Sequence, residues 1–202
     1  MQSLIDHARD FGRRAEELNH LACGQSPQAL FIACSDSRVI PSLITGADPG
    51  DLFELRTAGG IVPEYRSDRR SGESATIEYA VEILGVTDVV VCGHSHCGAV
   101  GALLRGDDLT AVPAVRDWLE SEAGDISEAG NGTGAGAART LDPHIADAVQ
   151  GHVLAQLDRL RSYPSIAPRL AAGQLRLHGW FYEIDTGSVT SHCPDRQAFL
   201  PL

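Results

Sequence analysis

Three residues of the kinds that bind zinc lie at the ends of two short apolar segments. Cys34 ends the run Ala29–Cys34, and His94 and Cys97 follow the run Val89–Cys92. Two thiolates and one imidazole suit zinc, with bonds of about 2.3 Å to sulfur and about 2.0–2.1 Å to nitrogen. Structural zinc sites are usually closed by four ligands. Three ligands therefore predict a catalytic ion whose fourth position takes water, with a pKa lowered toward about 7.

Asp36 and Arg38 come directly after Cys34 and are placed to control that fourth position. Alternate residues of an extended segment point the same way, so Arg38 can hold the Asp36 carboxylate in a bidentate pair. Held in this way, Asp36 accepts a hydrogen bond from the water on the metal. Released, it can bind the zinc itself. The pair is therefore predicted to switch the metal between an open and a blocked state.

Each of these residues has a plainer interpretation when it is taken alone. A buried cysteine is more often part of a core than a ligand, and an Asp–Arg pair is more often a solvated turn. Polar side chains grouped at the ends of buried strands are costly unless they bind something, so the combination favours a metal site. An enzyme that uses Cys97 as a nucleophile beside His94 remains an alternative.

The elements expected to carry these residues form an α/β fold. Apolar runs at Ala29–Cys34, Leu52–Leu55 and Val89–Cys92 predict buried strands, with helices between and after them. Such an alternation indicates a mostly parallel central sheet flanked by helices, in which ligands bind beyond the carboxyl ends of the strands. Leu175–Ile184 and Val189–His192 predict a C-terminal hairpin.

The rest of the chain is predicted to add helices and one loop to a single domain, residues 1–202. A helix capped by Ser3 is expected to form an N-terminal arm, residues 1–20. Residues 124–143 are rich in Gly, Ala, Asn and Thr and are expected to form a loop or an insertion. The pattern after them predicts a long helix with Ile145 and Leu160 on its apolar face.

Composition argues against several classes of partner. A net charge of −11 disfavours nucleic acid and anionic membrane surfaces. No segment approaches the roughly 20 consecutive apolar residues of a membrane span, and charges near the start argue against an export signal. The five cysteines are odd in number, which fits metal ligands or packing thiols in a reducing compartment. A cytoplasmic location is therefore expected.

The two site segments resemble the signature segments of β-class carbonic anhydrases. Ala33–Val39 reads Ala-Cys-Ser-Asp-Ser-Arg-Val, and Gly93–Gly98 reads Gly-His-Ser-His-Cys-Gly. The resemblance continues through Asp51–Phe53, Ile77–Ala80 and Leu177–Tyr182 and covers most of the chain. It implies reversible hydration of carbon dioxide to bicarbonate and a proton, one zinc ion per chain, and a homodimer or higher homo-oligomer with active sites near the dimer interface.

Carried over to this sequence, the resemblance assigns a role to each matching position. Zinc would be bound by Cys34, His94 and Cys97. Asp36 and Arg38 would form the catalytic dyad. The substrate pocket would be lined by the remaining matches, which are Gln25, Phe53, Ala58, Tyr79 and Gly98.

The chain is closer to the plant-like branch of that family than to the branch regulated by bicarbonate. The regulated branch usually has Trp where this chain has Phe31, which lacks the indole donor, although Arg56 and Tyr182 are present. Ala58 and Gly60 replace a valine and an asparagine that are usual in the plant-like branch, and both changes predict a looser pocket.

Two other functions are compatible with the same residues. One is a hydrolase of carbon disulfide or carbonyl sulfide on the same scaffold, because access to the pocket rather than the ligands would decide the substrate. The other is a non-catalytic zinc or bicarbonate-sensing module, which would bind metal tightly without turnover.

Overall fold

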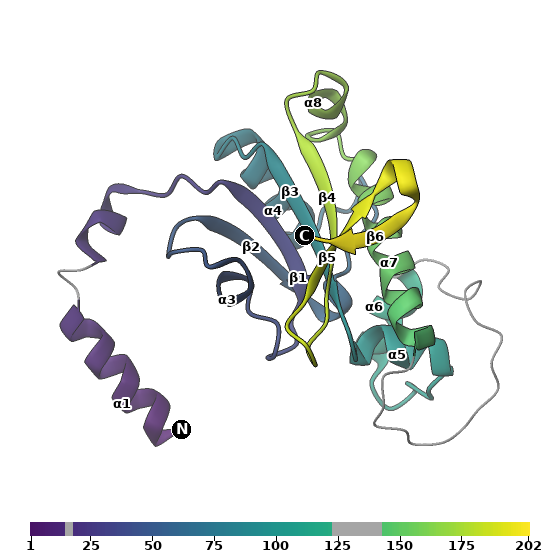
Figure 1. Ribbon diagram of the computed structural model, residues 1–202, viewed down its shortest axis with the longest axis horizontal. Coiled ribbons are helices and arrows are strands. Elements are labelled where there is room, and N and C mark those ends of the chain that lie inside the picture. Colours follow the sequence, from purple (N-terminus) through teal and green to yellow (C-terminus); the bar gives the residue numbers. More distant parts are fainter. Residues whose placement is uncertain (15–17, 123–142) are drawn as a thin grey trace.

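The computed structural model describes residues 1–14, 18–122 and 143–202. A six-stranded sheet with the order β2-β1-β3-β4-β5-β6 forms its centre (Figure 1). The first four strands run parallel and the last two antiparallel, which confirms the predicted mostly parallel α/β sheet with a C-terminal hairpin. The strands are β1 (Ala29–Cys34), β2 (Leu52–Thr57), β3 (Asp88–His94), β4 (Arg176–Tyr182), β5 (Val189–Cys193) and β6 (Ala198–Pro201).

Helices connect the strands and extend beyond them at the N-terminus. They are α1 (Gln2–Phe11), α3 (Pro41–Thr45), α4 (Gly72–Glu78), α5 (Gly98–Arg105), α6 (Pro113–Glu122), α7 (Pro143–Arg161) and α8 (Ala167–Ala171). A π-helical turn, Tyr79–Ile83, continues α4. No helix in these described ranges is both long and apolar enough to cross a membrane.

The N-terminal helix and α7 do not begin at the residues that the sequence predicted. Ser3 does not cap α1, because the helix already begins at Gln2 and the Ser3 hydroxyl instead lies 3.5 Å from His7 Nδ1. The expected N-terminal helix ends at Phe11, where 3₁₀ geometry takes over. The expected loop over residues 124–143 lies outside the described residues, except that Pro143 already begins α7.

The main core lies between the sheet and the helices α4 and α7. Side chains of β1 and β3 that point to this face, such as Leu30 and Val91, are almost fully buried against these helices. Two strand glycines let α7 approach closely. A methyl group at Gly93 would lie 2.6 Å from Val149 Cγ1, and one at Gly179 would lie 3.0 Å from Leu157 Cδ1. The position of α7 against the end of β3 therefore depends on the absence of a side chain at these positions.

The direction of the strand order changes between β1 and β3. The chain leaves β1 for β2 on one side and returns to β3 on the other side of β1. In open α/β sheets, such a switch point leaves a crevice beyond the carboxyl ends of the two strands. Cys34 ends β1 and His94 ends β3, so the topology places both at this crevice.

Candidate metal centre

Cys34, His94 and Cys97 converge beyond the carboxyl ends of β1 and β3. One potential ligand atom from each residue lies within 4.8 Å of the other two. All three side chains are buried, with exposed fractions of 8%, 1% and 4%. Cys97 reaches the group because it stands at the N-cap of α5, directly after a tight turn in which His96 adopts a φ of 57°.

His94 presents an unpaired acceptor to the two sulfur atoms. Its Nδ1 lies 2.8 Å from the Ser95 carbonyl oxygen. A carbonyl can only accept, so Nδ1 carries the hydrogen and Nε2 carries a lone pair. Nε2 is buried and has no hydrogen-bond partner among the described residues. A buried lone pair beside two thiols is costly unless it binds something, and a backbone carbonyl on the other ring nitrogen is the usual support of a metal-bound histidine.

The Cys34 thiol is prepared to ionise. A hydrogen bond from the Cys97 thiol is the largest cause, and it lowers the pKa of Cys34 to about 4 although burial acts in the opposite direction. The His94 ring and the backbone amides of Asp36 and Gly59 contribute to the same lowering of the pKa. The Asp36 amide nitrogen lies 3.4 Å from the sulfur. A thiolate is the form of cysteine that binds metal, so this environment favours a ligand.

The neighbouring Cys34 sulfur acts on the Cys97 thiol in the opposite direction. The pKa of Cys97 is raised by this sulfur and by burial, while the backbone amides of Ala99 and Val100 lower it. These amides belong to the first turn of α5, where N–H groups lack partners within the helix and favour negative charge. A cation between the sulfurs would displace the proton and turn both residues into thiolates.

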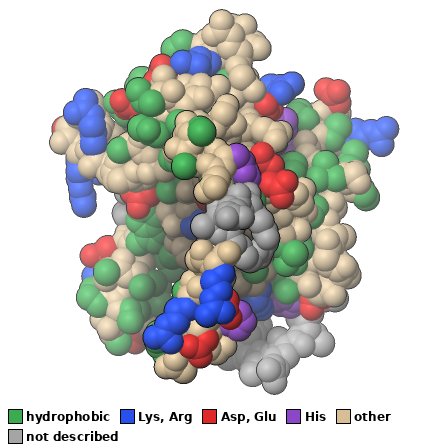
Figure 2. All heavy atoms as spheres, turned by 90° about the vertical axis from the view of Figure 1, so that its left-hand side faces the viewer, with side chains coloured by type: hydrophobic (Ala, Val, Ile, Leu, Met, Phe, Trp, Pro, Cys, Tyr) green, Lys and Arg blue, Asp and Glu red, His purple; other side chains and the backbone are tan. Residues whose placement is uncertain are grey.

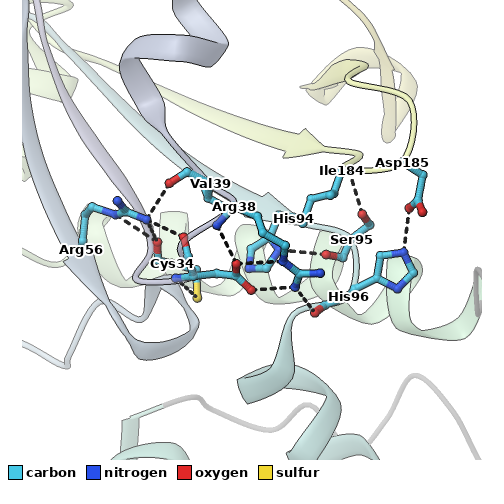
Figure 3. A network of polar contacts seen from close by, with 10 residues as sticks. Cys34, Arg38, Val39, Arg56, His94, Ser95, His96, Ile184 and Asp185 are labelled. Carbon is cyan, nitrogen blue, oxygen red and sulfur yellow. Dashed lines mark hydrogen bonds and ion pairs between the residues drawn. The ribbon is translucent and has the colours of Figure 1, made fainter. Parts of the chain in front are cut away.

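The Asp36 carboxylate is held firmly beside this group by Arg38. Arg38 Nε lies 3.0 Å from Oδ1, its NH2 group lies 2.7 Å from Oδ2, and its backbone nitrogen lies 2.9 Å from Oδ1. These donors hold the pKa of Asp36 well below its usual range, the side chain of Arg38 being the main cause. Arg38 also donates to the His96 carbonyl at 3.2 Å, which ties the loop after β1 to the turn after β3 (Figure 3).

Arg56 fixes the loop that carries Asp36. From β2 it donates to three carbonyl oxygens, those of Cys34 at 2.8 Å, Asp36 at 2.8 Å and Val39 at 2.6 Å. Figure 3 shows its guanidinium group turned toward Cys34 and Val39. Sequence reasoning gave Arg56 no part in positioning the centre, because carbonyl oxygens leave no signature in side-chain types.

The turn after β3 is held from the other side by the end of β4 and the hairpin. The Ser95 backbone nitrogen donates to the Tyr182 carbonyl at 2.9 Å, and the Ser95 hydroxyl accepts from the Ile184 nitrogen at 2.9 Å. His96 Nε2 lies 2.7 Å from an Asp185 carboxylate oxygen. These contacts span 87 to 89 positions of sequence. Sequence motifs could not predict these contacts, because they join residues that are far apart in the sequence.

Only part of the expected substrate pocket lies near these ligands within one chain. Gly98 follows Cys97 at the start of α5, and Ala58 follows Thr57, which pairs with Cys34 across the sheet. The other three predicted residues lie toward the opposite end of the strands, as the register of β1 and β2 shows.

That register separates the second group from the metal ligands. Phe53 pairs with Leu30, which precedes Cys34 by four residues and therefore by about 13 Å of strand. Tyr79 stacks on Phe53 with ring centroids 5.9 Å apart. Gln25 is exposed and precedes β1 altogether. Gln25, Phe53 and Tyr79 are thus not brought to their own chain's Cys34.

Known proteins give the same answer as this geometry. The family model for carbonic anhydrase matches residues 29–189. A carbonic anhydrase of Pseudomonas aeruginosa is 46% identical over 195 residues, covering 94% of this chain and 86% of that protein. Carbonic anhydrase 1 of Escherichia coli O157:H7 is 41% identical, covering 100% of this chain and 92% of that protein.

Similar solved structures identify the β class of carbonic anhydrases. The β-carbonic anhydrase CcaA superposes with a TM-score of 0.89 at 38% identity, covering 100% of this chain and 92% of that one. A tetrameric β-carbonic anhydrase of Sordaria macrospora superposes with a TM-score of 0.73 at 30% identity, covering 94% of each chain. The chain belongs to the β-carbonic anhydrase family.

The enzyme is therefore a carbonic anhydrase, which hydrates carbon dioxide reversibly. β-Carbonic anhydrases are zinc enzymes, and the Cys34–His94–Cys97 group has the donor set and the unpaired imidazole nitrogen that this metal requires. Neither the sulfur-compound hydrolase, nor the sensing module, nor the thiol enzyme is favoured by these matches.

Proposed function

We propose that this β-carbonic anhydrase works with one zinc ion per chain, held by Cys34, His94 and Cys97, and that Asp36 orients the attacking water. When bound there, zinc supplies a Lewis acid that lowers the pKa of water toward about 7. The observation that carries the proposal is the bidentate grip of Arg38 on Asp36 directly beside the three ligands.

The low pKa of Asp36 defines what its carboxylate can do. It stays ionised at neutral pH, so it is a hydrogen-bond acceptor and a poor acceptor of protons. Arg38 donates twice to Oδ1 and once to Oδ2, which leaves a lone pair on Oδ2 to receive a hydrogen bond from water. Asp36 thereby points the oxygen lone pair of that water toward carbon dioxide. The Gly98 amide and the Gln25 side chain are proposed to stabilise charge on the substrate oxygen.

Arg38 is proposed to keep Asp36 away from the metal. In Arg38→Ala, the carboxylate loses its partner and can turn toward the neighbouring zinc position. We expect the variant to retain zinc but to lose kcat/KM for hydration by about 100-fold, a size typical of a misplaced group in the site.

The chain offers a matched control for that variant. Arg105 and Asp107 form the same kind of bidentate pair at the same spacing, with distances of 3.2 and 2.6 Å, but away from the metal ligands. Arg105→Ala should leave stopped-flow hydration unchanged. Full activity of zinc-loaded Arg38→Ala would rule out the proposed role of the dyad.

We further propose that the substrate pocket is completed across a homodimer or a higher homo-oligomer. Gln25, Phe53 and Tyr79 lie too far along the sheet to reach their own metal centre, so they are proposed to line the partner's. Helix α1 supports association, because it projects from the body with no buried residue (Figure 1). Leu4 and Phe11 are exposed on it, and Figure 2 shows hydrophobic side chains spread over the side from which it projects.

A mixing experiment tests whether the pocket is shared. Phe53→Ala chains and Cys97→Ser chains are each expected to be nearly inactive. A mixed dimer would contain one intact site, built from the ligands of the first chain and Phe53 of the second. Regained hydration activity after mixing and refolding supports the shared pocket, whereas a mixture no more active than its components would contradict it.

The plant-like branch and a cytoplasmic location complete the proposal. Two of the three guanidinium nitrogens of Arg56 are engaged by backbone carbonyls, and the Phe31 ring packs edge-on against Trp180 with centroids 5.8 Å apart. Both observations support a structural role at positions that would otherwise receive regulatory bicarbonate. Added bicarbonate should then lower the hydration rate only by product inhibition at the active site, with no second inhibitory site.

Two thiolate ligands are best protected from oxidation in a reducing compartment, which favours the cytoplasm.

A further inference from the structure

A ladder of polar side chains on α7 and just beyond it binds the irregular segment 58–63, which leads away from β2. The residues recur at helical spacing and each bonds a backbone atom of that segment. The contacts are His152 Nε2 to the Gly59 oxygen at 3.0 Å, Gln156 Oε1 to the Val62 nitrogen at 2.9 Å, Arg159 to the Val62 oxygen at 2.9 Å and the Tyr163 hydroxyl to the Pro63 oxygen at 2.7 Å.

The His152 end of this ladder adjoins the metal ligands. Gly59 and Gly60 have φ values of 80° and 64°, which few other residues adopt readily. A methyl group at Gly60 would lie 3.3 Å from the Cys34 nitrogen, and one at Gly59 would lie 3.3 Å from the Ala99 methyl. The backbone that His152 grips is therefore packed directly against the Cys34 segment and the start of α5.

His152 can serve this contact in only one protonation state. The Gly59 carbonyl accepts, so Nε2 must carry a hydrogen, and Nδ1 then accepts from Gln156 Nε2 at 3.3 Å. His152 is 4% exposed, and its burial lowers its pKa to about 4, so the ring is neutral at pH 7. The Gln156 amide is oriented in turn by the Val62 nitrogen, which donates to its oxygen. The direction of every bond in the pair is thus determined.

We propose that His152 is a positioning residue of the metal centre, which holds the Gly59–Gly60 backbone against the Cys34 segment, and that Gln156 fixes the His152 tautomer. The inference rests on the proposed zinc site. Neither His152 nor Gln156 is a ligand, but both would influence how tightly the three ligands hold the metal. Groups that orient a ligand set how well it binds the metal, so a displaced Gly59–Gly60 backbone should weaken metal retention and alter the metal–sulfur bond.

The test compares zinc affinity with fold stability in matched variants. His152→Leu fills similar space but leaves the Gly59 oxygen without its donor. We expect its zinc affinity, measured by competition with a chromophoric chelator, to fall by about 10- to 100-fold, the range seen for groups that support metal ligands. His152→Gln keeps a donor near the Nε2 position and should recover most of the affinity.

Tyr163→Phe is the control for a purely structural effect. It removes a buried bond of the same ladder to the same segment, at Pro63 rather than at Gly59. It should lower the denaturation midpoint but leave zinc affinity within about twofold of the parent. Equal zinc affinity in Tyr163→Phe and His152→Leu would overturn the proposal, because the ladder would then act on the fold alone.

Two additional readouts keep the test decisive. If His152→Leu does not fold, Gln156→Met frees the His152 tautomer and should still lower zinc affinity at least threefold; unchanged affinity there contradicts the proposal. With Co²⁺ in place of zinc, His152→Leu should also shift the thiolate-to-metal absorption band, and Tyr163→Phe should not. A failure of the zinc site itself is distinguishable, because the parent protein would then bind no more zinc than Cys97→Ser.

Discussion

The two ends of β3 carry clusters of titratable side chains that are built in opposite ways. At the amino end, Asp88 accepts hydrogen bonds from Arg176 at 2.7 Å on each oxygen, from His178 at 2.8 Å and from Thr87 at 2.9 Å. At the carboxyl end, His94 Nε2 is buried and has no such partner within the described ranges. The first cluster is complete without a ligand, whereas the second is not.

This difference locates the chemistry better than cavity size does. A cavity of about 480 Å³ borders the Asp88 end of the strand, lined by Phe31, His178 and Trp180 among others. Asp88 in its lining is paired with Arg176, which is the main reason that the pKa of Asp88 lies below its usual range. The carboxyl end has an unpaired imidazole nitrogen and two neighbouring thiols. The unpaired His94 nitrogen beside two thiols, rather than the volume of a cavity, identifies the carboxyl end of β3 as the site of the chemistry.

The largest expected effect is loss of a sulfur ligand at the carboxyl end. Cys97→Ser should reduce bound zinc from one equivalent to a small fraction, and hydration activity should fall by more than about 100-fold, the upper range for a supporting group. Cys92→Ser is the control, since Cys92 is equally buried on β3 but burial raises its pKa to about 12 and it belongs to no ligand group. Metal analysis with stopped-flow hydration separates the two, and equal zinc loss in both would erase the distinction between ligand and packing thiol.

The next effect concerns the helix that braces the carboxyl end. Gly93→Ala puts a methyl group 2.6 Å from Val149 Cγ1, so α7 must move or the strand must bend. Overpacking of this kind typically costs about 1–3 kcal/mol of unfolding free energy. Gly151→Ala is the opposite case, because a methyl group there meets nothing within 4 Å and replaces a helix-interior glycine. Urea denaturation should show destabilisation in the first variant and a gain of up to about 1 kcal/mol in the second.

A smaller effect is expected when the pH is lowered. Burial is the main cause that lowers the pKa of His152 from 6.5 to about 4, with the charge of Arg159 a lesser one. Between these values the unfolded chain binds a proton that the folded chain does not. Stability from the neutral ring is therefore complete above pH 6.5 and is lost as the pH falls toward 4. At pH 5 the loss should be about 2 kcal/mol.

His152→Gln isolates that contribution from other titrating groups. It has no titratable side chain at this position, so its unfolding free energy should fall less between pH 7 and pH 5 than that of the parent. Parallel slopes for the two proteins would show that His152 is not the proton-sensitive group.

The same contrast explains which features could be predicted from the sequence. The strands β1 and β3 are recognisable in the sequence as apolar runs. Cys34 and His94 end these strands, and Cys97 follows β3 by three residues. Parallel strands with a switch point then bring those ends together. The Asp36–Arg38 contact was predictable for a similar reason, because it spans only two residues and follows from the direction of side chains on extended backbone.

Features held by distant backbone atoms could not be predicted in this way. His152 bonds Gly59 across 93 positions, and Arg56 finds three carbonyls whose approach depends on the finished fold. The short helix α3 and the edge strand β6 were also missed, since four or five residues carry too little periodicity to stand out. The Ser3 cap was predicted from residue type, but the N-cap is Met1, two residues earlier.

The smallest expected effect lies at the amino end and completes the comparison. Asp88→Asn keeps the shape of the side chain but removes the charge that pairs with Arg176 and His178. Half-exposed ion pairs contribute little, so Tm should fall by no more than about 4 °C. Zinc affinity and hydration should stay at the parent level, because this cluster is satisfied by its own partners. A fall in zinc affinity in Asp88→Asn, larger than that of Asp107→Asn in the exposed Arg105 pair, would mean that the two ends of β3 are coupled.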